Sequence, residues 1–323
     1  MSMLGASRFS RRSFCLCCIG AGAWARSGRW LGPDEVFAQA RNIVDSIRAA
    51  AAETPITVHK LRGGVSVLEG SGGNIAVLAG ADGAVLIDAG ITASRRRILD
   101  AVSGLSPTPV RLLINTHWHF DHADGNAWIR QEGASILAHE NTRSHLAKAQ
   151  RVEDWNFDFP QAPQAALPDE VFSDSKAVTI NGSTLALKHY GPAHTDSDIS
   201  VLFPEANVLH TGDTYWNGVY PFIDYSTGGG IAGTIAAAET NLALVGTDTI
   251  VLPGHGPGIS DKAGLRAFRD MLVSIRDEVA NLKARGRSLD ETIAAKPTAH
   301  FDAQWGQYAV GPALFTKLVY MGV

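Results

Sequence analysis

Four side chains that can bind a metal ion fall within residues 117–122. They are two imidazoles two residues apart, then a carboxylate and a third imidazole: His117, His119, Asp121 and His122. In an extended segment, residues i and i+2 point to the same side, so the first two can approach one metal together. If the chain turns after Phe120, the other two face a second position close by. Imidazole and carboxylate are suitable zinc ligands, so the segment predicts a metal site. The alternative is an unusually polar strand end.

One cluster cannot complete two metal sites, so further ligands must come from later in the chain. Three candidates stand at the ends of predicted strands, each in a polar turn that contains glycine: His194, Asp213 and His255. A lone histidine in a loop is more often a surface residue. Ligand sites lie together at one edge of such sheets. The shared position of the three residues at strand ends therefore supports the assignment of each as a metal ligand. For His139 and His210, which lie near strand ends without a motif, we expect structural roles.

With these motifs in this order, the chain resembles the metallo-β-lactamase superfamily from about residue 65 to about residue 257. The resemblance implies a first metal held by His117, His119 and His194. It implies a second metal held by Asp121, His122 and His255, with Asp213 bridging both. It also implies that Asp88, at the end of an early strand, supports the site by orienting a ligand imidazole.

Differences from particular branches of this family narrow the expected chemistry. All three cysteines, Cys15, Cys17 and Cys18, lie in a segment that we expect to be removed, so the mature chain lacks the cysteine ligand of one lactamase group. Asp213 makes the site similar to glyoxalase II and to acyl-homoserine-lactone lactonases. His119 stands where the flavodiiron pattern places a glutamate, which disfavours oxygen reduction at a di-iron site.

The activity implied is that of a β-lactamase-like, metal-dependent hydrolase with two Zn²⁺ ions, iron or manganese being the alternatives. Two metals about 3.5–4 Å apart would lower the pKa of a shared water, and the resulting hydroxide would attack a small cyclic amide, lactone or ester. Asp121 is the candidate to orient this nucleophile and relay its proton. Tyr215 could donate a hydrogen bond to the developing oxyanion, or could equally be a packed aromatic residue.

Other activities are compatible with the same residues. Within the hydrolases, the substrate could be an acyl-homoserine lactone or a glyoxalase II-like thioester. A mononuclear iron enzyme of the persulfide dioxygenase type shares nearly the same ligand residues. A binding protein without turnover is disfavoured by the intact set of seven ligands.

Residues 1–40 have the features of a twin-arginine signal peptide. The pattern Ser10-Arg11-Arg12-Ser13-Phe14 precedes an uncharged stretch over residues 14–25 that is too short to span a bilayer, and Ala38-Gln39-Ala40 supplies a cleavage site. A membrane anchor or a disordered tail is the alternative. We expect passage through the twin-arginine export machinery, a periplasmic or secreted location, and no stable membrane insertion after removal of the signal.

Charge argues against nucleic acid as a partner. Without residues 1–40, the chain retains 23 basic and 30 acidic side chains and a formal charge of −7. Such a chain would repel a phosphate backbone. A small-molecule substrate is the expected partner.

The elements that must position the site are strands first and then alternating helices and strands. Short runs rich in Val, Ile and Leu, separated by glycine turns, predict a meander of hairpins over residues 56–60, 65–69, 74–79 and 84–88. Residues 111–115 predict a buried strand that leads directly into the histidine motif. Helices at 92–104, 125–132 and 141–150 and a strand at 135–138 complete the first half.

The second half repeats this order. Strands are expected at 178–181, 184–189, 199–203, 207–210 and 249–252, and helices at 231–244, 262–285, 289–294 and 311–321. This repeated order of elements in the two halves fits two sheets packed face to face with helices outside. That arrangement is the four-layer α/β/β/α sandwich of the metallo-β-lactamase fold. Residues 41–323 are therefore expected to form a single α/β domain with a helical C-terminal tail.

Residues 155–174 interrupt the regular pattern with three prolines among aromatic residues. Long loops of this kind often face the substrate, although a packed surface connection is equally consistent with the sequence. We expect this loop, with its aromatics exposed, and residues 215–225 to line the substrate pocket.

Overall fold

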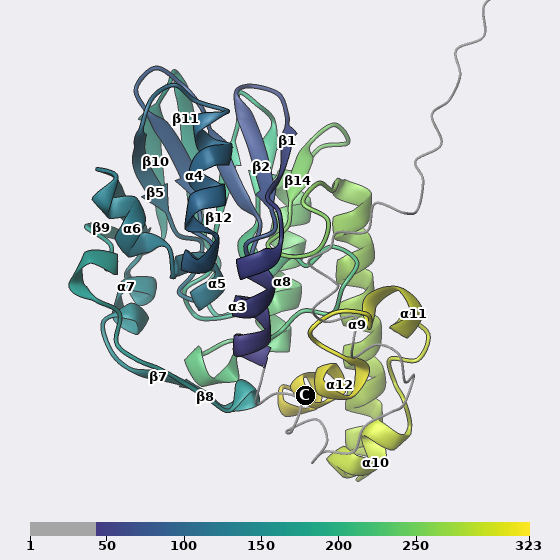
Figure 1. Cartoon of the computed structure of the whole chain (residues 1–323). Coiled ribbons are helices and arrows are strands. Elements are labelled where there is room, and N and C mark those ends of the chain that lie inside the picture. The colour runs from purple at the N-terminus through teal and green to yellow at the C-terminus, as the bar shows by residue number, and fades with distance from the viewer. Residues whose placement is uncertain (1–42) are drawn as a thin grey trace, which may run out of the picture.

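The computed structural model describes residues 43–323, so the predicted signal peptide over residues 1–40 lies outside the described residues. Two sheets lie face to face, with α4 and α6 on one outer side and α8 and α9 on the other (Figure 1). No helix within residues 43–323 is long and apolar enough to cross a membrane.

The first sheet has seven strands in the order β1-β2-β3-β4-β5-β6-β9. Its antiparallel half is the predicted meander: β1 (Thr57–Lys60), β2 (Val65–Glu69), β3 (Ile75–Leu78) and β4 (Ala84–Ile87). Three parallel strands extend it: β5 (Val110–Ile114), β6 (Ser135–His139) and β9 (Glu170–Phe172). The carboxyl ends of the parallel strands therefore meet at one edge.

The second sheet has five strands in the order β10-β11-β12-β13-β14. They are β10 (Ser175–Ile180), β11 (Ser183–His189), β12 (Ile199–Phe203), β13 (Val208–His210) and β14 (Ile250–Leu252), the last two being parallel. Buried aliphatic side chains such as Val67 and Ile87 from the first sheet and Leu185 and Val201 from the second form one core between the sheets. Alternating inward-facing residues in both sheets account for this burial.

Helices cover both outer faces. On the first sheet lie α4 (Arg95–Ser103) and α6 (Asn126–Gln131), which contribute Ile98 and Trp128 to a separate apolar cluster. The largest cluster contains side chains of α8 (Ile231–Leu244), α9 (Lys262–Ala284), α10 (Leu289–Ala294) and α12 (Pro312–Met321). The last helices follow well-defined caps: Asp261 caps α9, and Ser288 with Glu291 forms a capping box on α10. The predicted four-layer sandwich is confirmed.

The structure differs from the expected elements in four places. Helices α3 (Ile43–Glu53) and α11 (Asp302–Trp305) were not anticipated. Helix α7 (Glu140–Leu146) ends before residue 150, because Gln150–Val152 forms β7 and pairs with β8 (Phe157–Phe159). The segment 155–174 contains β8 and β9 in place of a plain loop. Its aromatics are not exposed: Trp155 and Phe159 are buried, and the others are half-buried.

Candidate metal centre

All seven predicted ligands follow the ends of strands and lie at one edge of the sandwich. Strand β5 ends at Ile114, and the chain bends over residues 116–118, where an extended segment was expected, before it reaches His119. Helix α5 (Phe120–Ala123) makes the expected turn at Phe120. His194 follows β11, Asp213 follows β13, and His255 follows β14. Gly254 permits the close approach of the last two segments, because a Cβ at this position would lie 2.0 Å from Asp213 Oδ1.

The seven side chains form three overlapping groups that could each hold a metal ion: His117 with His119 and His194, His117 with His122 and Asp213, and Asp121 with His122 and His255. Asp213 connects them. Its Oδ2 lies 3.4 Å from His194 Nε2 and 3.2 Å from His255 Nε2, and its Oδ1 lies 3.1 Å from His122 Nε2. The structure thus brings together both predicted ligand sets, with Asp213 between them.

The spacing of the ring nitrogens suits a cation. His194 Nε2 lies 2.9 Å from His119 Nδ1, and His122 Nε2 lies 3.2 Å from His255 Nε2. Two nitrogens on a tetrahedral zinc with bonds of about 2.0–2.1 Å are separated by roughly 3.3 Å. In addition, His117 Nε2 is buried without a hydrogen-bond partner within residues 43–323. Buried polar atoms are normally paired, so the donor set fits a bound metal.

The other nitrogen of most of these rings is held from outside the cluster. His117 Nδ1 lies 3.0 Å from Thr116 Oγ1, His119 Nε2 3.0 Å from Asp224 Oδ2, His122 Nδ1 2.7 Å from Asp88 Oδ2, and His194 Nδ1 2.7 Å from the Phe222 carbonyl oxygen. Such contacts fix the tautomer and the orientation of a ligand imidazole. Each of these four rings therefore turns its other nitrogen toward the cluster.

Asp88 has the supporting position that the sequence predicted. It follows β4 in a left-handed conformation, with φ of 69°. Its Oδ1 accepts the backbone N–H of Thr116 and its Oδ2 accepts the Thr116 hydroxyl, both at 2.7 Å, in addition to the contact with His122. One carboxylate thus orients His122 directly and His117 through Thr116.

Asp224 has the same function for His119, and sequence reasoning missed it. Besides the imidazole, this buried carboxylate accepts hydrogen bonds from Ser226 N and Thr227 Oγ1. It lies 105 positions from His119 along the chain, and no local motif connects the two residues. Its place inside the expected pocket segment 215–225 was the only available signal.

Asp224→Asn is expected to weaken metal binding about 10- to 100-fold, because the amide holds His119 with a weaker and differently oriented hydrogen bond. Competition with a chromogenic chelator measures this affinity. Asp169→Asn is the matched control, since Asp169 contacts Arg130 and the backbone of Ile136, away from the cluster. Equal affinities in the two variants would show that Asp224 does not support the centre.

Burial and mutual charge tune the side chains of the cluster. Burial, with the neighbouring His122, lowers the pKa of His117 well below its ordinary value. Burial opposes ionisation of Asp213, but His255 and His122 hold the pKa of this carboxyl well below its usual range. Burial likewise acts to lower the pKa of His255, but Asp213 and Asp121 raise it to about 9. The two buried carboxylates thus require positive charge nearby, and metal binding would displace protons.

Tyr215 is not part of this centre, and the expectation of an oxyanion donor is corrected. Its side chain is fully buried and does not line the cavity beside the cluster. The hydroxyl donates to Asn217 Oδ1 at 3.0 Å and lies 2.7 Å from Ser260 Oγ. The ring packs against Phe268, 5.2 Å between centroids. The packed-aromatic alternative describes its position.

Tyr215→Phe is therefore expected to leave kcat/KM and metal content unchanged within about twofold. Loss of the buried hydroxyl contacts should reduce the free energy of unfolding by about 1 kcal/mol. Steady-state kinetics and urea unfolding of the same preparation measure the two effects. A fall in kcat of a hundredfold with normal stability would restore the oxyanion role.

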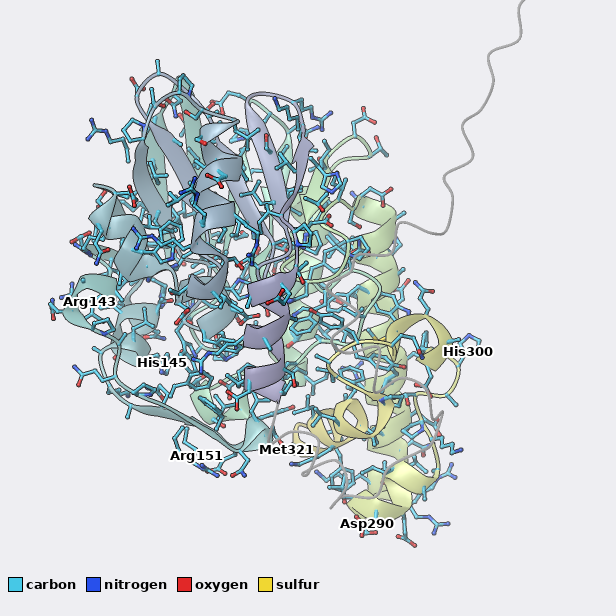
Figure 2. All side chains as sticks on the ribbon, viewed as in Figure 1. Arg143, His145, Arg151, Asp290, His300 and Met321 are labelled. Carbon is cyan, nitrogen blue, oxygen red and sulfur yellow. The ribbon has the colours of Figure 1, made fainter. Side chains whose placement is uncertain are left out.

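The histidines without motifs have the structural roles expected of them. His210 Nε2 lies 3.2 Å from the Asn74 carbonyl oxygen, and His210 Nδ1 accepts the N–H of Gly212. His139 caps α7 and stacks on His189 with centroids 3.7 Å apart. His300 lies at the outer surface (Figure 2).

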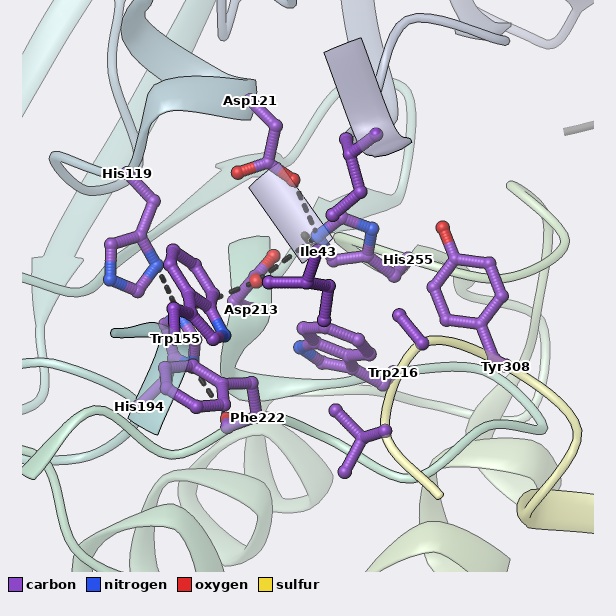
Figure 3. Close-up of a pocket in the computed structure, with 13 residues that line it drawn as sticks. Ile43, His119, Asp121, Trp155, His194, Asp213, Trp216, Phe222, His255 and Tyr308 are labelled. Atoms are coloured by element: carbon purple, nitrogen blue, oxygen red, sulfur yellow. Dashed lines mark hydrogen bonds and ion pairs between the residues drawn. The ribbon is translucent and has the colours of Figure 1, made fainter. Parts of the chain in front are cut away.

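A cavity opens beside the cluster. Asp121, Asp213, His119, His194 and His255 form its floor, and Trp155, Trp216, Phe222 and Tyr308 form its walls (Figure 3). Ile43 and Ile47 of α3 and residues 309–310 close it. The two predicted pocket segments thus contribute Trp155, Trp216 and Phe222, whereas α3 and the C-terminal segment were not foreseen.

The profile of the metallo-beta-lactamase superfamily matches residues 68–255. Over 174 residues the chain is 22% identical to the metallo-beta-lactamase type 2 of Bacteroides fragilis, covering 54% of this chain and 64% of that relative. The match therefore spans less than two thirds of that relative.

Two solved structures have a similar fold. A metallo-beta-lactamase from Pontibacter korlensis matches with a TM-score of 0.54 and 20% identity over 68% of this chain and 99% of that one. The stereoselective inverting sec-alkylsulfatase Pisa1 from Pseudomonas sp. matches with a TM-score of 0.60 and 17% identity over 89% of this chain and 54% of that one. At these identities the likeness shows the fold alone.

Proposed function

This chain belongs to the metallo-beta-lactamase superfamily, and on that premise we propose that it is a hydrolase that uses two Zn²⁺ ions to cleave a small cyclic amide, lactone or ester. The convergence of the two ligand sets on Asp213 is the observation that carries this proposal. A carboxylate in contact with both ligand sets can bridge two cations.

Each predicted ligand has a definite role in this proposal. His117, His119 and His194 would hold one ion, Asp121, His122 and His255 the other, and Asp213 both. Such a pair of cations supplies a nucleophilic hydroxide at neutral pH and polarises a carbonyl oxygen. Asp121 lines the cavity, and its Oδ2 lies 3.2 Å from His255 Nε2. Its carboxylate can orient the attacking water and accept its proton.

The test is a substrate panel applied to the zinc-loaded protein: a chromogenic cephalosporin, an acyl-homoserine lactone and a thioester. We expect hydrolysis of at least one, abolished by a chelator and by His117→Ala but retained by His300→Ala at the surface. Cephalosporin turnover would favour lactamase activity, and its absence would favour lactone or thioester chemistry. A protein that carries one iron and no zinc would contradict the proposal in favour of an oxygenase.

We also propose that residues 1–40 direct export through the twin-arginine machinery to the periplasm or beyond. The Arg11-Arg12 pair followed by an uncharged stretch supports this. Arg11→Lys with Arg12→Lys in the full chain should retain the protein in the cytoplasm of a bacterial host, measured by cell fractionation. Equal export of both forms would contradict the proposal.

A further inference from the structure

Within residues 43–323, no lysine or arginine side chain lines the cavity. Apart from the predicted metal ligands, the residues that line it within the described chain are apolar or aromatic: Ile43, Ile47, Trp155, Trp216, Phe222, Tyr308, Ala309 and Val310. Arginines such as Arg143 and Arg151 lie at the outside of the molecule (Figure 2). An anionic substituent held against these walls would lose its hydration without a charged partner, which is costly.

Two walls nevertheless present unused hydrogen-bond donors. Trp155 Nε1 and Trp216 Nε1 are both buried, and neither has a partner within residues 43–323. Each indole as a whole is only 5% exposed. An indole N–H can donate but never accept, so each of these groups requires an acceptor that the described chain does not supply.

The two indoles flank the two halves of the metal centre. The Trp155 ring lies 5.1 Å from that of His119 and stacks on Phe222, with centroids 4.5 Å apart. The Trp216 ring lies 4.1 Å from that of His255. In the view of Figure 3, the nitrogen of each indole is on the edge that faces the other indole. The two indoles thus lie beside the metal centre, one next to each predicted ligand set.

We propose that Trp155 and Trp216 are positioning residues that donate hydrogen bonds to the oxygens of the substrate, and that this substrate is an uncharged ester or lactone. This inference rests on the proposed function and selects among its substrate classes. Both oxygens of an ester accept hydrogen bonds. The N–H of a secondary amide would place a second donor against the indole donor, and the sulfur of a thioester is a weak acceptor. The ring nitrogen of a cephalosporin carries no hydrogen, but its carboxylate would lack a charged partner on these walls.

Hydrolysis of such a substrate balances with water alone. The hydroxyl of water bonds to the acyl carbon, the bond from this carbon to the alkoxy oxygen breaks, and the second proton of water passes to the departing alkoxide. The products are a carboxylic acid and an alcohol, or one hydroxy acid from a lactone. The indole donors hold the oxygens in place during this exchange and keep their own protons.

The test uses zinc-loaded protein and three neutral probes of one shape: phenyl acetate as the ester, phenylacetone as its unreactive ketone, and propylbenzene, which lacks an acceptor. Trp155→Phe and Trp216→Phe remove the N–H and keep an aromatic ring. Each should lower kcat/KM for phenyl acetate and weaken phenylacetone binding about tenfold, the effect of one neutral hydrogen bond. Binding of propylbenzene and metal content should not change. Isothermal titration measures the binding.

Trp128→Phe is the matched control. Its indole is also buried and its Nε1 also lacks a partner, but it packs in the apolar cluster under α6, away from the cavity. It should leave kinetics and binding within twofold of the parent. 4-Acetoxybenzoate, the carboxylated form of phenyl acetate, should react at least tenfold more slowly than the neutral ester.

The outcomes separate this inference from the proposed function. Binding of phenylacetone that depends on both indoles, in a protein that hydrolyses neither phenyl acetate nor any substrate of the panel, would support the indole contacts and contradict the hydrolase. Three results would overturn the inference: no binding of phenylacetone to the parent, equal binding to the two cavity variants, or loss of metal in them. Faster hydrolysis of the carboxylated ester, or of acetanilide in place of phenyl acetate, would overturn the assignment of the substrate class.

Discussion

Asp213→Asn is expected to lower kcat/KM by at least about 1,000-fold, equivalent to about 4 kcal/mol of transition-state stabilisation. Asp213 is the side chain in contact with both predicted ligand sets, through His194, His255 and His122. The amide has no charge to balance two cations, and its NH₂ group would direct a donor at a metal. We therefore expect the bridge to fail even though the shape of the side chain is kept.

Steady-state kinetics on the best substrate of the panel, with metal content measured on the same sample, check this result. Asp174→Asn is the control, because Asp174 forms an exposed ion pair with Lys188. A variant at position 213 that keeps two metals and activity within tenfold of the parent would show that this carboxylate is not a bridge.

Asp88→Ala should be the most destabilising substitution near the centre, lowering the free energy of unfolding of the metal-free protein by about 3–6 kcal/mol. The alanine would leave three buried donors without an acceptor, on Thr116 N, Thr116 Oγ1 and His122 Nδ1. Each buried donor left unsatisfied costs about 1–3 kcal/mol. The left-handed backbone at this position also disfavours alanine.

Urea unfolding in the presence of a chelator measures this loss, so that metal binding does not contribute. Asp88→Asn separates shape from charge: it keeps one acceptor oxygen and should lose less than half as much stability. Metal affinity should fall in both variants about 10- to 100-fold, because His122 is no longer oriented by a carboxylate. If the alanine variant unfolds at the same urea concentration as the parent, these hydrogen bonds do not stabilise the fold.

Much of the fold was predictable because the pattern of apolar residues and glycine turns within each short segment indicates a strand or a helix. Glycine-separated runs predicted the meander of β1 to β4, and the second series of strands predicted the second sheet. The metal ligands were predictable for a related reason. Because β4 and β5 are parallel, and so are β13 and β14, residues that follow these strands must lie close together at the sheet edge.

What could not be predicted depends on contacts between distant segments. Nothing near Asp224 indicates that it faces His119, and nothing near Trp155 indicates that its ring is buried beside that imidazole. The expectation for Tyr215 failed because two residues of separation from Asp213 do not fix which way a side chain points after the 3₁₀ turn at Gly212–Thr214. The Tyr215 ring instead packs against Phe268, and this contact determines which way the side chain points.

The walls of the cavity show the same limit. Ile43 and Ile47 belong to α3, and Tyr308 to a C-terminal segment, and both lie outside the residues that match the family profile. The family resemblance therefore covers the floor of the site and the walls formed by Trp155, Trp216 and Phe222, whereas α3 and the segment around Tyr308 lie outside it. Substrate preference should accordingly follow these walls.

The central claim is that this chain holds two zinc ions on seven side chains around Asp213. The most direct test is elemental analysis of the exported protein, purified without chelator, by inductively coupled plasma mass spectrometry against protein concentration. The account predicts two zinc per chain, falling to one or fewer in Asp213→Asn. One iron and no zinc per chain, or two zinc that persist in Asp213→Asn, would contradict it.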